Sequence, residues 1–440
     1  MGGVSVQVAR GRGREPEGRA EAAPLATSAD PRDAEAFNTR QNAVHGAVQA
    51  TAINLFNPFL GIDLIRLGGD NLEVGLLSAL PPLAATLSNI LGARWLAGRR
   101  DPLRAGAAMF LAARLLLLGL AAINLTGGGG AWRPAALILV VGLLNLPAAV
   151  GNLSWQSVLT GLLSPGRRAR ALGLRGIMAS VAGVSTALVC GWLARDWHGT
   201  AGYAALFTLA AAVGSVEVAV FLRFRGRPAI QRYPASIGTA ARRVWRDSHY
   251  RAYTLCCLPF YLGWLMAWPL FLRFQVSFAH ATNLWMGTFA AVNAMAAVGG
   301  NLAWSRVGER IGARFALPVA CMLLAGVPLT YTFAPNLVGI LFNNVWGGLM
   351  GAGVNLFLLM RLMEVSPPED RVVAMGVANT VIGAVGVVGP LLGIALLRVL
   401  PLPAIFWVPT ALRFSGGVAL LGAGIGMVRL RGGLLRRAPV

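Results

Sequence analysis

The feature that most constrains this chain is a succession of apolar runs separated by short polar segments. A run of about 20 apolar residues in helical form spans the hydrocarbon core of a bilayer. Hydrophobic residues make up 56% of the chain and charged residues only 12%, and the mean hydropathy of +0.63 is too high for a soluble domain. Because a chain in lipid must satisfy its backbone hydrogen bonds internally, the repeated runs predict a bundle of membrane-spanning helices.

The charges and the cysteines agree with a membrane protein. All 38 basic residues are arginine, the formal net charge is +21, and most arginines lie in segments that flank apolar runs. A basic balance also occurs in nucleic-acid-binding proteins, but this placement favours the membrane and predicts no nucleic-acid partner. The 4 cysteines lie inside apolar runs without metal-ligand spacing. We therefore expect no metal and no cofactor.

The apolar runs predict twelve spans in two groups of six. The first group lies within 41–223 and the second within 251–430, and a basic linker at 224–250 separates them. Residues 1–40 contain no apolar run and are expected to form a disordered cytoplasmic tail, and 431–440 form a C-terminal tail. We expect the linker to be solvated, with a basic interfacial helix near its end as the alternative.

The arginines also predict the orientation of the spans. The loops and the C-terminal tail on one side of the predicted bundle contain 25 arginines. The loops on the other side contain five, namely Arg66, Arg133, Arg195, Arg273 and Arg398. By the positive-inside rule, the arginine-rich side, with both termini, is cytoplasmic.

The two groups of spans resemble each other in sequence. Asn152-Leu153 and Ser164-Pro165 at the fourth span correspond to Asn355-Leu356 and Ser366-Pro367 at the tenth, at an offset of 202–203 residues. Internal repeats of this kind are typical of transporters, in which two pseudo-symmetric bundles rock about a central site and expose it to each side in turn.

A charged glycine–arginine loop between the second and third spans recurs between the eighth and ninth. The second copy is Glu309-Arg310-Ile311-Gly312-Ala313-Arg314, and the first keeps Gly98, Arg99 and Arg100 but has Trp95 at the position expected to be acidic. With six plus six spans and a basic central loop, the chain resembles the major facilitator superfamily. The resemblance implies an all-α membrane fold of twelve transmembrane helices in two pseudo-symmetric six-helix bundles, with a pathway lined by the first, fourth, seventh and tenth spans. It also implies a gating role for Gly98, Arg99, Arg100, Glu309, Arg310, Gly312 and Arg314.

Polar residues inside the spans are the candidates for a substrate cavity, because polar groups within a bilayer are costly and face the bundle interior. They recur at helical spacing on single faces of their spans, and aromatic rings there can stack on flat solutes. The candidates are His45, Gln49 and Asn57 in the first span, Asn145, Asn152 and Gln156 in the fourth, Trp264 and Trp268 in the seventh, and Asn344 and Asn355 in the tenth. The alternatives are hydrogen bonds between helices for the polar residues and a lipid-facing position for the tryptophans.

Three charged residues inside the spans are candidates for coupling transport to an ion. Glu217 in the sixth span comes first, because desolvation favours the neutral form of a buried carboxyl, which can then load and release a proton. Asp63 in the first span and Arg114 in the third are the others. His45 also titrates in the physiological range. The alternative is that Glu217 pairs with a neighbouring arginine, and Asp63 with Arg66 one turn later.

We therefore predict a secondary active transporter that moves a small organic solute by alternating access, with proton coupling left open. The neutral, polar and aromatic candidates favour an uncharged or amphipathic solute, unless Arg114 and Arg413 both face the cavity. The alternative is a non-transporting sensor or lipid-handling protein on the same scaffold. An enzyme is disfavoured because the spans contain no clustered nucleophile, acid or metal ligands, and a chain without lysine has no GxxxxGK[ST] loop for ATP. We expect a monomer in the plasma membrane, with the bilayer and the solute as its partners.

Overall fold

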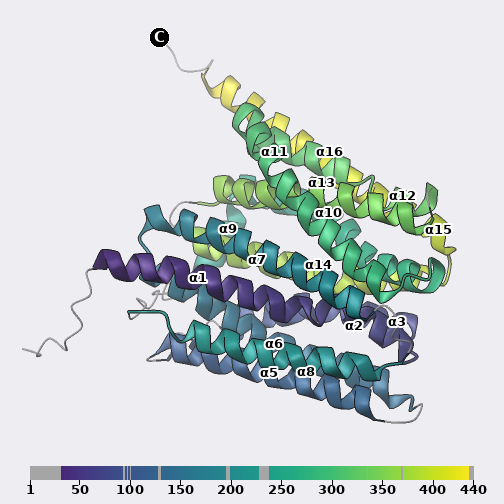
Figure 1. Ribbon diagram of the computed structural model, residues 1–440. Coiled ribbons are helices and arrows are strands. Elements are labelled where there is room, and N and C mark those ends of the chain that lie inside the picture. Colours follow the sequence, from purple (N-terminus) through teal and green to yellow (C-terminus); the bar gives the residue numbers. More distant parts are fainter. Residues whose placement is uncertain are drawn as a thin grey trace, which may run out of the picture.

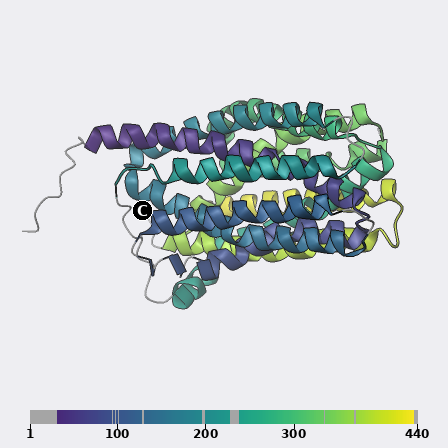
Figure 2. The ribbon, with the colours of Figure 1, turned by 60° about the horizontal axis from the view of Figure 1, so that its bottom comes forward.

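The computed structural model describes most of the chain after the N-terminal tail, and the described residues form helices and no strand. The described ranges are 31–92, 95–96, 98–99, 101–126, 130–194, 199–226, 237–333, 335–367 and 370–435. The long helices run roughly side by side along one direction (Figure 2), as expected for segments that cross a bilayer.

The N-terminal part of the chain forms the first group of crossings. The first crossing is broken into two helices, and the second continues from an α-helix into a short π-helix. The elements are α1 (Pro31–Asn54), α2 (Asn57–Arg66), α3 (Asn71–Leu87), η1 (Ser88–Gly92), α5 (Pro102–Leu125), α6 (Trp132–Leu162), α7 (Pro165–Leu193) and α8 (Ala201–Phe221).

The C-terminal part forms the second group, after a short helix in the linker. The linker helix is α9 (Ile237–Arg246). The following elements are α10 (Ser248–Arg273), η2 (Phe274–Phe278), α11 (Asn283–Leu324), α12 (Leu329–Phe333), α13 (Leu337–Val365), α14 (Arg371–Leu396), α15 (Leu402–Ile405) and α16 (Trp407–Leu435). In Figure 1 the green-to-yellow helices of this part lie above the purple-to-blue helices of the first part.

The number of crossings agrees with twelve. Among the described residues, 10 helical stretches are long and apolar enough to cross a membrane. One of them, 283–333, is 51 residues long and contains two crossings, and α3 with η1 supplies one more. The chain is thus an all-helical membrane protein of two six-helix groups.

Several helices begin at a side chain that caps them. At the start of α3, Asp70 accepts a hydrogen bond from the Glu73 amide at 2.8 Å, and the Glu73 carboxylate accepts one from the Asp70 amide at 2.8 Å. Asp101, Asp247 and Asn336 accept amide hydrogen bonds at the starts of α5, α10 and α13. Such caps bond the first amides of a helix, which have no partner within the helix.

Proline explains two breaks in the helices. α1 ends at Asn54 and α2 begins at Asn57, directly before Pro58, which suits the first turn of a helix. α11 ends at Leu324, where Pro328 lacks the amide that would bond the Leu324 carbonyl in a continuing helix.

The chain reverses direction within α11 at Gly312. Its backbone has φ 73° and ψ 156°, a conformation that is accessible mainly to glycine. Before the reversal, Gly308 lies beside Phe357 of α13; after it, the Leu323 carbonyl accepts a hydrogen bond from Trp346 of α13. The predicted eighth and ninth spans are therefore the two arms of α11.

Three predicted boundaries differ from the structure. α1 begins at Pro31, so residues 31–40, expected to be a disordered tail, are helical, while residues 1–30 lie outside the described residues. α9 occupies part of the linker that was expected to be solvated, because Ala240 and Val244 bury its apolar face against the C-terminal bundle. α16 continues to Leu435, and residues 436–440 lie outside the described part of the chain.

Candidate substrate cavity and its gate

A cavity of about 530 Å³ lies between the two groups of helices. α3 and α6 contribute its N-terminal wall, and α10, α13 and α14 contribute its C-terminal wall. The lining residues are Pro82, Ala85, Thr86, Ala149, Asn152, Leu153, Gln156, Tyr261, Trp264, Leu265, Trp268, Asn355, Asn379, Ile382, Gly383 and Gly386. A space of this size is typical of small-molecule sites.

Five of the predicted cavity residues line this space. They are Asn152, Gln156, Trp264, Trp268 and Asn355. Sequence reasoning did not single out Thr86 and Asn379, which also line it. A polar residue inside the otherwise apolar run of α14 was the available signal for Asn379.

The other five predicted residues do not line the cavity. Asn57 is exposed at the start of α2. The amides of Asn145 and Asn344 donate to carbonyls of their own helices. Asn145 lies seven residues before Asn152, about 10 Å along the helix, so it shares the face of Asn152 but not its depth. His45 and Gln49 belong to a separate polar cluster inside the N-terminal bundle.

This buried cluster is built around Glu217 of α8. Arg114 of α5 donates to Glu217 Oε2 through Nε at 3.0 Å and Nη2 at 2.7 Å. Gln49 donates to Glu217 Oε1 at 2.8 Å, and His45 Nε2 lies 3.6 Å from the same oxygen. The Glu217 side chain is fully buried. Two of the predicted coupling residues therefore form an ion pair with each other, as in the alternative of a neighbouring arginine.

Arg175 of α7 joins the same cluster, although the sequence pattern assigns it to a loop. Its Nη1 lies 2.7 Å from His45 Nδ1, and its Nη2 donates to Gln49 Oε1. Its guanidinium also lies 4.2 Å from the ring centre of Trp155. Because a guanidinium only donates, His45 Nδ1 accepts and carries no proton in this contact. The one sequence signal that Arg175 lies inside a helix rather than in a loop was its distance from the helix start at Pro165.

Asp63 and Arg66 are bound to different partners. Asn124 of α5 donates to Asp63 Oδ2 at 2.9 Å, and Arg66 donates to the Tyr203 hydroxyl at 2.7 Å. Among the described residues, Asp63 is thus held by Asn124 rather than by the ion pair with Arg66 that the one-turn spacing suggests. The two helices of the first crossing place these side chains at the arginine-poor end of the molecule.

At this arginine-poor end the two bundles are in direct contact. The Tyr203 hydroxyl of α8 donates to Asn283 Oδ1 of α11 at 2.8 Å, and Asn283 Nδ2 donates to the Ala194 carbonyl after α7 at 2.8 Å. We call Tyr203, Asn283 and Ala194 the bundle clasp. Nearby, α7 and α11 approach so closely that a Cβ on Gly287 would overlap the Ala187 carbonyl. The clasp closes the cavity at the end where α2, α3 and α15 lie in Figure 1.

The opposite, arginine-rich end is loosely packed. A Cβ added to Gly173 or Gly176 of α7, or to Gly376 of α14, would meet no atom within 4 Å. Ile177 and Met178 of α7 are exposed. In Figure 1, α11 and α16 diverge from α1 toward the side where α9 lies. From this looser packing, compared with the clasped end, we infer that the cavity opens toward the arginine-rich end.

The first predicted gating loop contains a cation–π contact. Gly98 and Arg99 are exposed, and the Arg99 guanidinium lies 4.3 Å from the ring centre of Trp95. Trp95 occupies the position expected to be acidic, so its ring partly replaces the missing carboxylate as a partner for arginine. Arg100 lies outside the described residues.

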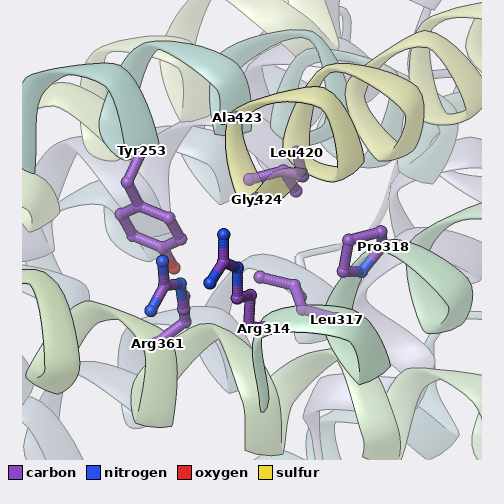
Figure 3. Close-up of a pocket in the computed structure, with 8 residues that line it drawn as sticks. All are labelled: Tyr253, Arg314, Leu317, Pro318, Arg361, Leu420, Ala423 and Gly424. Carbon is purple, nitrogen blue, oxygen red and sulfur yellow. The ribbon is translucent and has the colours of Figure 1, made fainter. Parts of the chain in front are cut away.

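The second predicted gating loop lies at the reversal of α11. Glu309, Arg310 and Gly312 are exposed. Arg314 faces a small pocket between α10, α13 and α16, which it shares with Arg361 (Figure 3). The volume of this pocket is about 10 Å³, room for one water molecule, so it cannot hold an organic solute.

The mid-span arginines do not line the cavity. Arg413 of α16 is 1% exposed and donates to the Gly263 carbonyl at 3.2 Å and to the Leu324 carbonyl at 3.1 Å. Leu324 ends the helical arm that Pro328 interrupts, and Arg413 adds a second hydrogen bond to this carbonyl, which also accepts from the Val327 amide at 3.2 Å. Arg114 pairs with Glu217, as described above. Neither arginine introduces a charge into the cavity lining.

Together these features define a membrane protein of the carrier class: two matched helical bundles around a central cavity that is closed at one end and open at the other. The chain belongs to the Major Facilitator Superfamily, whose family model matches residues 44–363. It is a transporter and not an enzyme. Comparison with curated proteins gives no match.

Several solved transporters have the same fold. A mutant of the nucleoside transporter NupG superposes with a TM-score of 0.73 at 13% identity, covering 88% of this chain and 99% of that one. A bacterial homologue of the iron transporter ferroportin in an inward-facing state gives 0.67 at 11% identity, covering 88% and 99%. A bacterial homologue of the human lysosomal transporter Spinster, inward-facing and occupied, gives 0.63 at 14% identity, covering 91% and 97%. At these identities the similarity concerns the fold alone.

Proposed function

We propose that this transporter carries a small, uncharged or amphipathic organic solute by alternating access. The observation that supports this is the cavity of about 530 Å³ between the bundles, with a clasp at one end and an opening at the other. The solute would bind in the cavity, and the bundles would then rock about it to open the clasped end.

We further propose that the arginine-rich end faces the cytoplasm of a plasma-membrane protein that works as a monomer. The bias of arginine toward that end supports this orientation, with both termini inside. The described conformation would then be open to the cytoplasm, and two neighbours of similar fold are likewise described as inward-facing.

The described residues that line the cavity include no Asp, Glu, Lys, Arg or His, and this supports an uncharged solute. A charged solute would lose its hydration without gaining a partner of opposite charge. The nucleoside carried by the neighbour NupG is one example of an uncharged organic solute, although that similarity extends to the fold only.

Proton coupling is a separate part of the proposal, with Glu217 and His45 as its candidates. Taking up a proton at Glu217 would weaken two charge-assisted hydrogen bonds from Arg114. Coupling through Glu217 would therefore require Arg114 to move during the cycle. A pH-jump flux measurement on Glu217→Gln tests this: full proton-driven flux in the variant would remove Glu217 from coupling.

Flux through proteoliposomes tests the transport function. We expect Asn152→Leu combined with Asn355→Leu to abolish uptake or efflux, because both side chains line the cavity from opposite bundles. The matched control is Asn145→Leu combined with Asn344→Leu, on the same two helices but outside the cavity. Equal flux in both double variants would contradict the cavity assignment.

A second candidate function is that of a non-transporting sensor or lipid-handling protein on this scaffold. It predicts a different result in the flux assay. The wild-type chain would then bind a solute or lipid but support no net flux above empty vesicles. The cavity, open at one end only and lined from both bundles, supports the carrier instead.

A further inference from the structure

The cavity has an aromatic wall formed by one face of α10. Tyr261, Trp264 and Trp268 follow one another at helical spacing, so their side chains project from the same face. The Tyr261 and Trp264 rings are stacked, with centroids 6.2 Å apart and planes at 14°. Trp268, five residues before the end of α10, is 56% exposed and lines the cavity.

The cavity also contains four carboxamides. Asn152 and Gln156 lie one turn apart on α6, Asn355 projects from α13, and Asn379 projects from α14; all four are exposed. Within the described part of the chain, the side chains of Asn152, Gln156 and Asn379 make no hydrogen bond, whereas Asn355 donates to the Gly351 carbonyl at 2.9 Å. A carboxamide offers a donor and an acceptor side by side.

We propose that this site selects an uncharged, planar heteroaromatic ring whose edge carries both hydrogen-bond donors and acceptors; the inference rests on the proposed transport function. The ring stacks against the aromatic wall of α10, and its edge pairs with the carboxamides of Asn152 and Gln156. Asparagine and glutamine bond such edges through two atoms at once, as they do with adenine. A rigid flat ring also loses little conformational entropy on binding.

The two walls come from different bundles. The aromatic wall belongs to the C-terminal bundle, and Asn152 and Gln156 belong to the N-terminal bundle. A ring held by both walls therefore bridges the parts that must move relative to each other. A solute that reaches only one wall would bind without this bridge and would be carried poorly.

Binding to the full-length protein in lipid nanodiscs, measured by calorimetry, tests the inference. The probes are adenosine and nicotinamide as uncharged planar rings with polar edges, benzoate as a planar anion, and glucose as an uncharged non-planar solute. We expect adenosine to bind saturably, with benzoate and glucose at least about tenfold weaker. Trp268→Leu should weaken adenosine binding by about tenfold through lost stacking. Trp407→Leu, an exposed tryptophan of α16 outside the cavity, is the matched control and should bind as the wild type does.

Three results would overturn the inference: no saturable binding of either planar uncharged probe, binding of benzoate or glucose as tight as that of adenosine, or unchanged adenosine binding in Trp268→Leu. Since Trp268 is exposed, its truncation is not expected to unfold the protein, and size-exclusion profiles check this. The flux assay distinguishes a failure of the ring selectivity from a failure of the transport function. If a solute of another class is carried and the Asn152→Leu, Asn355→Leu variant abolishes its flux, transport stands and ring selectivity is wrong.

Discussion

Replacing Asn283 by alanine should open the clasped end of this transporter. Asn283 makes two buried hydrogen bonds between the bundles, accepting from Tyr203 at 2.8 Å and donating to the Ala194 carbonyl at 2.8 Å. When the clasped end opens, these groups exchange their partners for water, so each bond contributes a net ~0.5–1.5 kcal/mol to the closed state. Asn283→Ala removes both bonds and should favour the open state by about 1–3 kcal/mol, a change of roughly 5- to 150-fold in the ratio of open to closed molecules.

Electron–electron distance measurements between two spin labels report that ratio. Leu125 at the end of α5 and Val399 after α14 are 68% and 79% exposed and lie at the clasped end of different bundles. Labels at these positions, in a chain whose 4 native cysteines are replaced by alanine, should show one short-distance population in the parent. In Asn283→Ala a longer-distance population should grow.

Asn343→Ala is the matched control for this experiment. Asn343 is 4% exposed and donates to the Val327 carbonyl at 3.1 Å, but this bond lies within the C-terminal bundle. The control should lower thermal stability without changing the distance distribution. If Asn283→Ala leaves the distribution unchanged, or Asn343→Ala shifts it equally, the clasp does not hold the bundles together.

Three further variants test the packing around the cavity. Gly287→Ala should raise the ratio of open to closed molecules in the same distance measurement by roughly 5- to 150-fold, for ~1–3 kcal/mol of overpacking against α7. Gly299→Ala on the same helix has room for its methyl group and should leave that ratio unchanged. Arg114→Met should lower the free energy of unfolding by about 3–5 kcal/mol, because it leaves Glu217 buried without its ion pair. Adding Glu217→Leu should restore much of this loss, as measured by thermal unfolding. If the effects of the two substitutions simply add in the double variant, the pairing is refuted. Arg413→Met should lower the melting temperature but leave solute affinity unchanged, since Arg413 bonds backbone carbonyls away from the cavity; a change of affinity would contradict this.

Part of the candidate site could be predicted from the sequence. Asn152, Gln156 and Asn355 stand out as polar residues in apolar runs, and the correspondence of Asn152 with Asn355 under the repeat points to a shared space. Helical periodicity identifies a face but not a depth along it. For that reason Asn145 and Asn344 fit the same pattern, although the structure places them outside the cavity.

Only some members of the polar cluster in the N-terminal bundle could be predicted from the sequence. A buried carboxylate at Glu217 and a mid-span Arg114 each require a partner, and the sequence therefore suggests that they are paired or functional. Arg175 does not stand out in this way, because in the sequence it is one of several arginines near a helix start and only its distance from Pro165 sets it apart. Its contact with His45 depends on how α7 packs against α1, which no local pattern contains.

By itself, the sequence determined that the chain crosses a membrane as two related groups of six helices, because hydrophobic length and internal hydrogen bonding leave a membrane segment few other folds. Only the tertiary structure decided which side chains meet: Asn283 with Tyr203 across the bundles, Glu217 with Arg114 within one, and the aromatic face of α10 opposite the carboxamides of α6. The physical reason is that such contacts depend on the rotation and axial shift of each helix against its neighbours, and these are set by the packing of the whole bundle.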